Sequence, residues 1–197
     1  MRTVVGITGA SGIVYGVRIL KALPRPKTVI VSEDAAKIAG VELRMTKREL
    51  EALADDRFDN TDLFSPLSSG SVRFDAMVVA PCSTSTMSKI ACGIADNLIT
   101  RVASVALKER RRLVLLIRET PLSSIHLGNM ERLASAGAIV MPACPAFYPE
   151  PRSVKDLVDF IAGRVLDELG IPNDLYKRWS GKRPNPTGTR VSRRTPR

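Results

Sequence analysis

This chain of 197 residues has little histidine, cysteine or aromatic content. It contains one histidine, His126, and three cysteines, Cys82, Cys92 and Cys144, with no Cys-x-x-Cys pair. An odd cysteine count with one histidine disfavours a disulfide framework and a zinc site, so we expect buried, inert thiols and no bound metal. A single histidine without a nucleophile elbow also disfavours a Ser-His-Asp triad, so His126 is expected to pack or to cap a helix.

The chain also lacks a long hydrophobic run. No apolar stretch reaches the roughly 20 residues that cross a bilayer, and Arg2 and the early glycines interrupt any signal-peptide core. A hydrophobic fraction of 44% and a charged fraction of 25% are typical of a soluble globular domain. We therefore expect a cytoplasmic protein with no membrane partner.

Acidic residues are missing after Asp174, which makes the end of the chain strongly basic. Six of the positive charges behind the net charge of +10 lie in 180–197, and without them the chain carries about +4. Aromatic residues make up only 5% and are not interleaved with the basic ones, which disfavours nucleic acid as a partner. We interpret 1–179 as a single domain and 180–197 as a basic, disordered tail.

Short apolar runs alternate with stretches of helical periodicity. Strands are predicted over 2–7, 27–32, 74–80, 112–118 and 137–142, and helices over 12–23, 34–42, 46–54, 85–95, 98–109, 122–135 and 153–169. Residues 55–73 are interpreted as a flexible connection. This alternation predicts an α/β fold of Rossmann or flavodoxin type, a three-layer sandwich with a doubly wound, mainly parallel sheet. Such sheets bind their ligands at the carboxyl ends of the strands.

The first predicted strand ends in a loop with Gly6, Gly9 and Gly12, and a helix follows at once. Glycines allow close backbone approach, and a helix start presents free N–H groups, so this loop is expected to receive a phosphate. The alternative is an ordinary glycine-rich turn. The Gly-x-x-Gly-x-x-Gly spacing does not choose among FMN, NAD or another phosphorylated ligand.

Three further segments offer polar groups. Residues 81–88 place hydroxyls between a strand and a helix, where they either cap the helix or bind a phosphate or ribityl group. Arg118 and Glu119 close the most hydrophobic strand and form either a structural ion pair or an anion contact with a proton-transfer group. Arg101 and Lys108 fall roughly on one helix face, which is either a solvated helix end or part of a site.

Several of these segments together resemble the UbiX-type flavin prenyltransferase family. The resemblance is carried by Gly6–Gly12, Ala80–Ser88, Asp96–Arg111, Arg118–Met130 and Pro145–Tyr148, and it extends from about residue 3 to Trp179. It implies a metal-independent transfer of a dimethylallyl group from dimethylallyl phosphate to N5 and C6 of reduced FMN. The prenylated FMN then serves as cofactor for a UbiD-type decarboxylase. The resemblance also implies a homododecamer with sites between subunits.

Individual roles follow from the same resemblance. It assigns FMN binding to Gly9, Ala10, Ser11, Ser32, Ser83, Thr84, Ser85, Thr86 and Arg118. It assigns the dimethylallyl phosphate site to Arg101, Lys108, Arg118, Tyr148 and Arg164. Chemical roles fall to Ser11, Glu42, Lys108 and Glu119, with either Glu119 or the released phosphate removing the C6 proton.

Two other functions compete with this interpretation. A flavin-dependent cysteine decarboxylase would share the fold and FMN, but that group depends on an early histidine and residues 1–125 contain none. A non-catalytic flavin- or dinucleotide-binding module would need no cationic cage, although the acidic residues after Ser32 resemble those that bind an NAD ribose.

Overall fold

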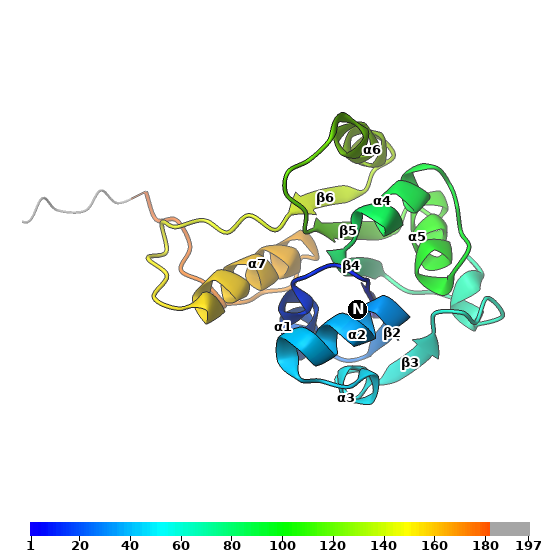
Figure 1. Ribbon diagram of the computed structural model, residues 1–197, viewed down its shortest axis with the longest axis horizontal. Coiled ribbons are helices and arrows are strands. Elements are labelled where there is room, and N and C mark those ends of the chain that lie inside the picture. Colours follow the sequence, from blue (N-terminus) through cyan, green and yellow to red (C-terminus); the bar gives the residue numbers. More distant parts are fainter. Residues whose placement is uncertain (182–197) are drawn as a thin grey trace, which may run out of the picture.

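The computed structural model describes residues 1–181, which form one six-stranded, all-parallel sheet between two layers of helices (Figure 1). The strand order is β3-β2-β1-β4-β5-β6. The strands are β1 (Thr3–Ile7), β2 (Lys27–Val31), β3 (Asp56–Asp59), β4 (Ala76–Cys82), β5 (Arg112–Ile117) and β6 (Ile139–Pro142). The chain order reverses between β1 and β4, which is where doubly wound sheets bind their ligands.

Within residues 1–181, six α-helices and one short 3₁₀ helix connect the strands, and a seventh α-helix follows β6. The helices are α1 (Ile13–Ala22), α2 (Glu33–Leu43), α3 (Lys47–Glu51), α4 (Thr84–Ala91), α5 (Leu98–Lys108), α6 (Ser124–Ser135) and α7 (Val154–Glu168), with η1 at Pro66–Ser68. α1, α2, α3 and α7 contribute to the core on one face of the sheet, and α4, α5 and α6 to the core on the other.

Both cores follow from the alternation of side chains along the strands. On β1, Val5 and Ile7 point into the core under α1 and α7, whereas Val4 points into the core under α4 and α5. All five β1 residues are buried. A strand covered on both faces reads as a continuous apolar run, which is why the sequence predicts the inner strands correctly.

β3 was not predicted, and the interpretation of 55–73 as a flexible connection is wrong there. This strand is short, polar and at the sheet edge, with only Phe58 partly buried, so it carries no hydrophobic signal. η1 lies in the same segment. The other predicted strands and helices are confirmed, with ends that differ by a few residues. The predicted tail, apart from its first two residues, lies outside the described residues.

The expectation of three buried thiols is correct only for Cys82. Burial raises the pKa of that thiol well above its ordinary value, which keeps it protonated and unreactive. Cys92 and Cys144 are exposed, because one ends α4 and the other lies in the loop after β6. Within residues 1–181, no helix is both long and apolar enough to cross a membrane.

Candidate active site

The carboxyl ends of β1 and β4 are joined by the buried side chain of Thr8. Its hydroxyl donates a hydrogen bond to the Pro81 carbonyl at 2.8 Å and accepts one from the Ser83 backbone N–H at 2.8 Å. This threonine therefore fixes the glycine loop beside the hydroxyl-rich segment 83–86. The sequence predicted both segments for the site but assigned no role to Thr8.

The start of α1 is already filled by a carboxylate of the same chain. Both Glu42 carboxylate oxygens accept from the Gly12 N–H at 3.0 Å, and one also accepts from the Ile13 N–H at 3.0 Å. Gly12 takes a positive φ of 103° and offers no side chain to cap the helix. Glu42 thus satisfies the N–H groups that were expected to face a phosphate, and phosphate binding by the glycine loop stays a prediction.

A polar hollow of about 400 Å³ opens instead in front of α4. We name it the α4 hollow. Its polar lining comes from five connecting loops and from α4: Thr8, Gly9, Ser32, Asn60, Ser83, Thr84, Ser85, Thr86, Lys89 and Asn97. The Glu33 and Asp34 side chains of α2 line its other side. Ser83 caps α4 by accepting from the Thr86 N–H at 3.2 Å, and the first turn of α4 has no acidic residue. Glu33 and Asp34 occupy the first turn of neighbouring α2, so of these two helix starts at the hollow only that of α4 favours an anion.

The sequence did not single out three residues that line the α4 hollow. Asn60 accepts from the Ile99 N–H at 3.1 Å, which ties the end of β3 to the start of α5. Asn97 caps α5, and Lys89 forms an ion pair with Asp96 at 2.7 Å. Asn60 follows the unpredicted strand β3, so its approach to α5 could be seen only in the folded chain. The Asn97-x-x-Thr100 capping box was readable in the sequence, but its place in the hollow was not.

Arg118 reaches from the end of β5 to the glycine loop. Its Nε donates to the Ser11 carbonyl at 2.9 Å, so the guanidinium lies beside the exposed Ser11. Among the described residues, no ion pair joins Arg118 to Glu119, whose carboxylate accepts from the Thr120 N–H at 3.0 Å. The alternative of a structural Arg–Glu pair is therefore wrong, and both groups remain at the rim.

A second, largely apolar pocket of about 220 Å³ lies next to these two residues. Its lining includes Ile117, Leu122, Met130, Pro142 and Cys144 around Arg118 and Glu119. Tyr15 interacts electrostatically with two residues of this lining. Burial raises the pKa of its phenol, the Cys144 thiol adds to this rise, and the Arg118 guanidinium opposes it. A carboxylate and a guanidinium therefore border an apolar pocket.

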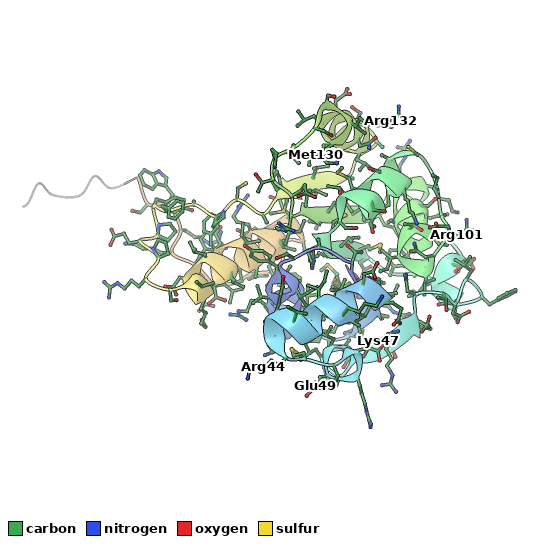
Figure 2. All side chains as sticks on the ribbon, viewed as in Figure 1. Arg44, Lys47, Glu49, Arg101, Met130 and Arg132 are labelled. Carbon is green, nitrogen blue, oxygen red and sulfur yellow. The ribbon has the colours of Figure 1, made fainter. Side chains whose placement is uncertain are left out.

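Arg101 and Lys108 both face the η1 segment, as their helical spacing predicts. The Arg101 Nε donates to the Ser68 carbonyl at 3.0 Å, and Lys108 pairs with Glu109 at 2.6 Å (Figure 2 labels Arg101 on α5). α5 starts at the carboxyl edge of the sheet, beside Asn60, and ends just before β5 begins. Its length of about 16 Å separates Lys108 from the glycine loop of the same chain.

Tyr148 and Arg164 lie together on the α7 side of the molecule. The Tyr148 ring contacts Phe160 of α7 edge-on, with ring centroids 5.9 Å apart. Arg164 pairs with Asp167 and Glu168 at 3.2 Å each, and a hydrogen bond with Tyr176 raises its pKa. None of these contacts joins either residue to the glycine loop or to Arg118. One chain therefore does not assemble all the predicted phosphate-binding residues.

His126 has the capping role that the sequence allowed. Its N–H donates to the Ser123 hydroxyl and its Nδ1 accepts from the Ser123 N–H, each at 3.3 Å, at the start of α6. Within residues 1–181, no three His, Cys, Asp or Glu side chains are grouped to hold a metal ion.

Comparisons with known proteins agree with this arrangement. The Flavoprotein family profile matches residues 1–166. The flavin prenyltransferase UbiX of Methanocaldococcus jannaschii is 52% identical over 181 residues, 91% of this chain and 98% of that protein. The solved structure of AnUbiX (PadA1) in complex with FMN and dimethylallyl pyrophosphate is 43% identical, covers 92% of this chain and 98% of its own, and superposes with a TM-score of 0.90.

A second solved structure bears on assembly. The dodecameric FMN-dependent Ubix-like decarboxylase from Escherichia coli O157:H7 is 42% identical, with a TM-score of 0.90, and the alignment covers 92% of this chain and 100% of that one. Identity and coverage of this size show the family, and they agree with the motifs and with the site at the carboxyl edge of the sheet. The chain belongs to the UbiX family of flavin prenyltransferases.

Proposed function

We propose that this protein transfers a dimethylallyl group from dimethylallyl phosphate to N5 and C6 of reduced FMN. The observation that carries the proposal is the pairing of the α4 hollow with the Arg118–Ser11 contact at the switch point of the sheet. The glycine loop thus borders the start of α4 through Thr8 and Gly9 and contacts the Arg118 guanidinium through Ser11, and an apolar pocket lies next to Arg118. The Methanocaldococcus jannaschii relative is named a flavin prenyltransferase, which supports prenyl transfer to a flavin.

The residues present fit FMN. The phosphate would lie at the start of α4, where Ser83, Thr84, Ser85 and Thr86 supply hydroxyl and N–H donors. Ser32 and the backbone of Gly9, Ala10 and Ser11 would border the ribityl chain and ring, and Arg118 would contact the ring. Gly9 has no room for a side chain, because a Cβ there would lie 2.7 Å from the Asp34 Cβ. When bound, reduced FMN supplies the nucleophilic N5 and C6 atoms.

The chain's own groups would stabilise the leaving phosphate. Cations and a phenol around it would neutralise the charge that develops as the allylic carbon–oxygen bond breaks. We assign this role to Arg101, Lys108, Arg118, Tyr148 and Arg164. The apolar pocket would exclude water from the reacting carbon, and Glu119 at its edge is placed to move the C6 proton.

These cations come from opposite parts of one chain, so the site needs more than one copy. We propose that the chain assembles as a dodecamer, like the Escherichia coli relative, and that Arg101, Lys108, Tyr148 and Arg164 complete the site of a neighbouring subunit. Glu42 would then hold the glycine loop and border the phosphate donor. A UbiD-type decarboxylase as recipient of the product rests on the family resemblance, and the cytoplasmic location stays a prediction.

The test is anaerobic incubation of the full chain with reduced FMN and dimethylallyl phosphate, followed by mass spectrometry of the extracted flavin. One added C5 prenyl unit, lost in Glu119→Gln, would support the proposal. Dimethylallyl diphosphate in a parallel reaction identifies the donor. Unmodified FMN with both donors would favour a flavin-binding module that performs no transfer.

A further inference from the structure

Asp167 is the centre of a hydrogen-bond cluster at the end of α7. Its side chain is only 15% exposed. Its two oxygens accept from Arg164 at 3.2 Å, Arg178 at 2.7 Å, the Tyr176 hydroxyl at 2.6 Å and the Asn173 amide at 2.9 Å. Three of these four partners belong to the segment 173–179, which we name the C-terminal clasp. Asp167 therefore holds the clasp against α7.

The clasp in turn contacts Tyr148 through a chain of aromatic rings. Trp179 meets the Tyr148 ring edge-on with centroids 5.5 Å apart, and Tyr176 meets Phe160 at 4.8 Å. Phe160 is the α7 residue on which Tyr148 packs. Figure 1 shows the chain before α7 and the chain after it on the same side of the molecule, away from α4 and α5. Tyr148 thus has α7 on one side and the clasp on the other.

Gly163 allows the clasp to lie this close to α7. A Cβ at that position would be 2.5 Å from the Tyr176 ring and 2.9 Å from the Asn173 amide oxygen. The Asn173 amide also donates to the Gly163 carbonyl at 3.2 Å. The close approach depends on the absence of a side chain, since any larger residue would push the clasp away.

Arg164 is oriented by the same carboxylate. One guanidinium nitrogen bonds Asp167 and the other bonds Glu168, from positions three and four residues further along α7. A guanidinium has five N–H donors in a rigid plane, so this pairing fixes the direction of the plane and leaves donors for a further anion.

We propose that Asp167 is a positioning residue for the phosphate donor: it orients Arg164 directly and holds Tyr148 in place through the C-terminal clasp. This inference rests on the proposed function, in which Arg164 and Tyr148 bind the phosphate of the donor. Within residues 1–181, the side-chain hydrogen bonds and ion pairs of Asp167 all join it to Arg164 or to the clasp. Its removal should therefore change donor binding more than the chemical step.

The test compares Asp167→Asn with the unchanged full chain. We expect the KM for dimethylallyl phosphate to rise about tenfold, since a charged hydrogen-bond acceptor is lost, while kcat and the FMN Kd change less than about threefold. Trp179 is the single tryptophan of the chain, so its emission in flavin-free protein reports the clasp directly. Because Trp179 is already 69% exposed, its emission anisotropy is the sensitive quantity, and it should fall when the ring is released from Tyr148. Asp174→Asn removes an exposed carboxylate of the same segment and is the matched control. It should change neither the KM for dimethylallyl phosphate nor the emission anisotropy of Trp179.

Tyr176→Phe provides a second, milder variant. It removes one hydrogen bond to Asp167, keeps the ring on Phe160 and should raise the KM by a smaller factor; it decides the question if Asp167→Asn does not fold. An unchanged KM in both variants, or a fall confined to kcat, would overturn the inference.

Calorimetric titration with inorganic phosphate separates this inference from the proposed function. If the unchanged chain does not prenylate FMN, that result contradicts the proposed function and does not test the positioning role of Asp167. A roughly tenfold weaker phosphate Kd in Asp167→Asn would still support the positioning role, and an equal Kd would overturn it.

Discussion

The Glu42 carboxylate lies on the backbone N–H of Gly12, with both carboxylate oxygens at 3.0 Å from the nitrogen. Gly12 begins α1 with no capping side chain of its own, so a residue 30 positions later supplies the missing acceptor. Carboxylates favour helix starts for the same reason that phosphates do. The fold therefore places its own anion at one helix start and leaves that of α4 free.

Glu42→Ala should destabilise the protein by about 1 kcal/mol, the usual cost of losing a helix-capping acceptor. Urea unfolding of the flavin-free chain measures this change. Glu131→Ala on the exposed surface of α6 is the control and should be close to neutral. Equal unfolding midpoints for the two variants would show that the Glu42 contact contributes nothing to stability.

Ser83→Ala should weaken FMN binding by about tenfold, because the hydroxyl both caps α4 and lines the proposed phosphate site. Quenching of flavin fluorescence gives the Kd. Ser123→Ala removes the corresponding cap of α6, outside the α4 hollow. Both variants should lose about 1 kcal/mol of stability, and only Ser83→Ala should lose FMN affinity. A matching loss of FMN affinity in Ser123→Ala would show that reduced stability, and not a lost contact with FMN, weakens binding.

Acid should open the C-terminal clasp. Burial raises the pKa of Asp167, but hydrogen bonds from Arg178, Tyr176 and Asn173 outweigh it and hold the pKa at about 2, below the ordinary 3.8. A carboxyl with a lowered pKa stabilises the folded state above its unfolded value and loses that contribution as the pH falls.

The emission anisotropy of Trp179 should therefore stay constant from pH 7 to about pH 4 and fall between about pH 4 and pH 2. Asp167→Asn should show the lowered anisotropy already at pH 7, with no such transition. Far-UV circular dichroism separates local opening from global unfolding. A transition centred well above pH 4 would assign the change to another group.

Mixing subunits should restore activity between two inactive variants. Lys108 precedes β5 and Glu119 follows it, so the two residues lie at opposite ends of that strand. A site that contains both would therefore take them from different copies of the chain. We expect Lys108→Ala and Glu119→Gln to be inactive alone, and mixed assemblies refolded from both to regain activity in the sites where both natural residues meet. Mass spectrometry of the flavin measures the recovery. Mixed assemblies with no recovered activity would indicate that one chain supplies both residues.

Prediction from the sequence succeeded where hydrophobic burial dominates. β1, β4 and β5 are continuous apolar runs, and Ser83, Ser123 and Ser153 mark helix starts by local capping chemistry. It failed at β3, because an edge strand with polar residues has no burial pattern. It also failed for Cys92 and Cys144, whose exposure depends on where their loops lie.

By itself, the sequence determined the α/β class, the parallel order of elements and the chemical types gathered at the carboxyl edge, because periodicity and capping are local properties. Only the tertiary structure decided which groups meet. It placed Glu42 on the α1 start and formed the α4 hollow. It also brought Arg118 to Ser11 and separated Lys108 from these two residues. These outcomes depend on contacts between residues 30 to 107 positions apart, and no local pattern encodes such distances.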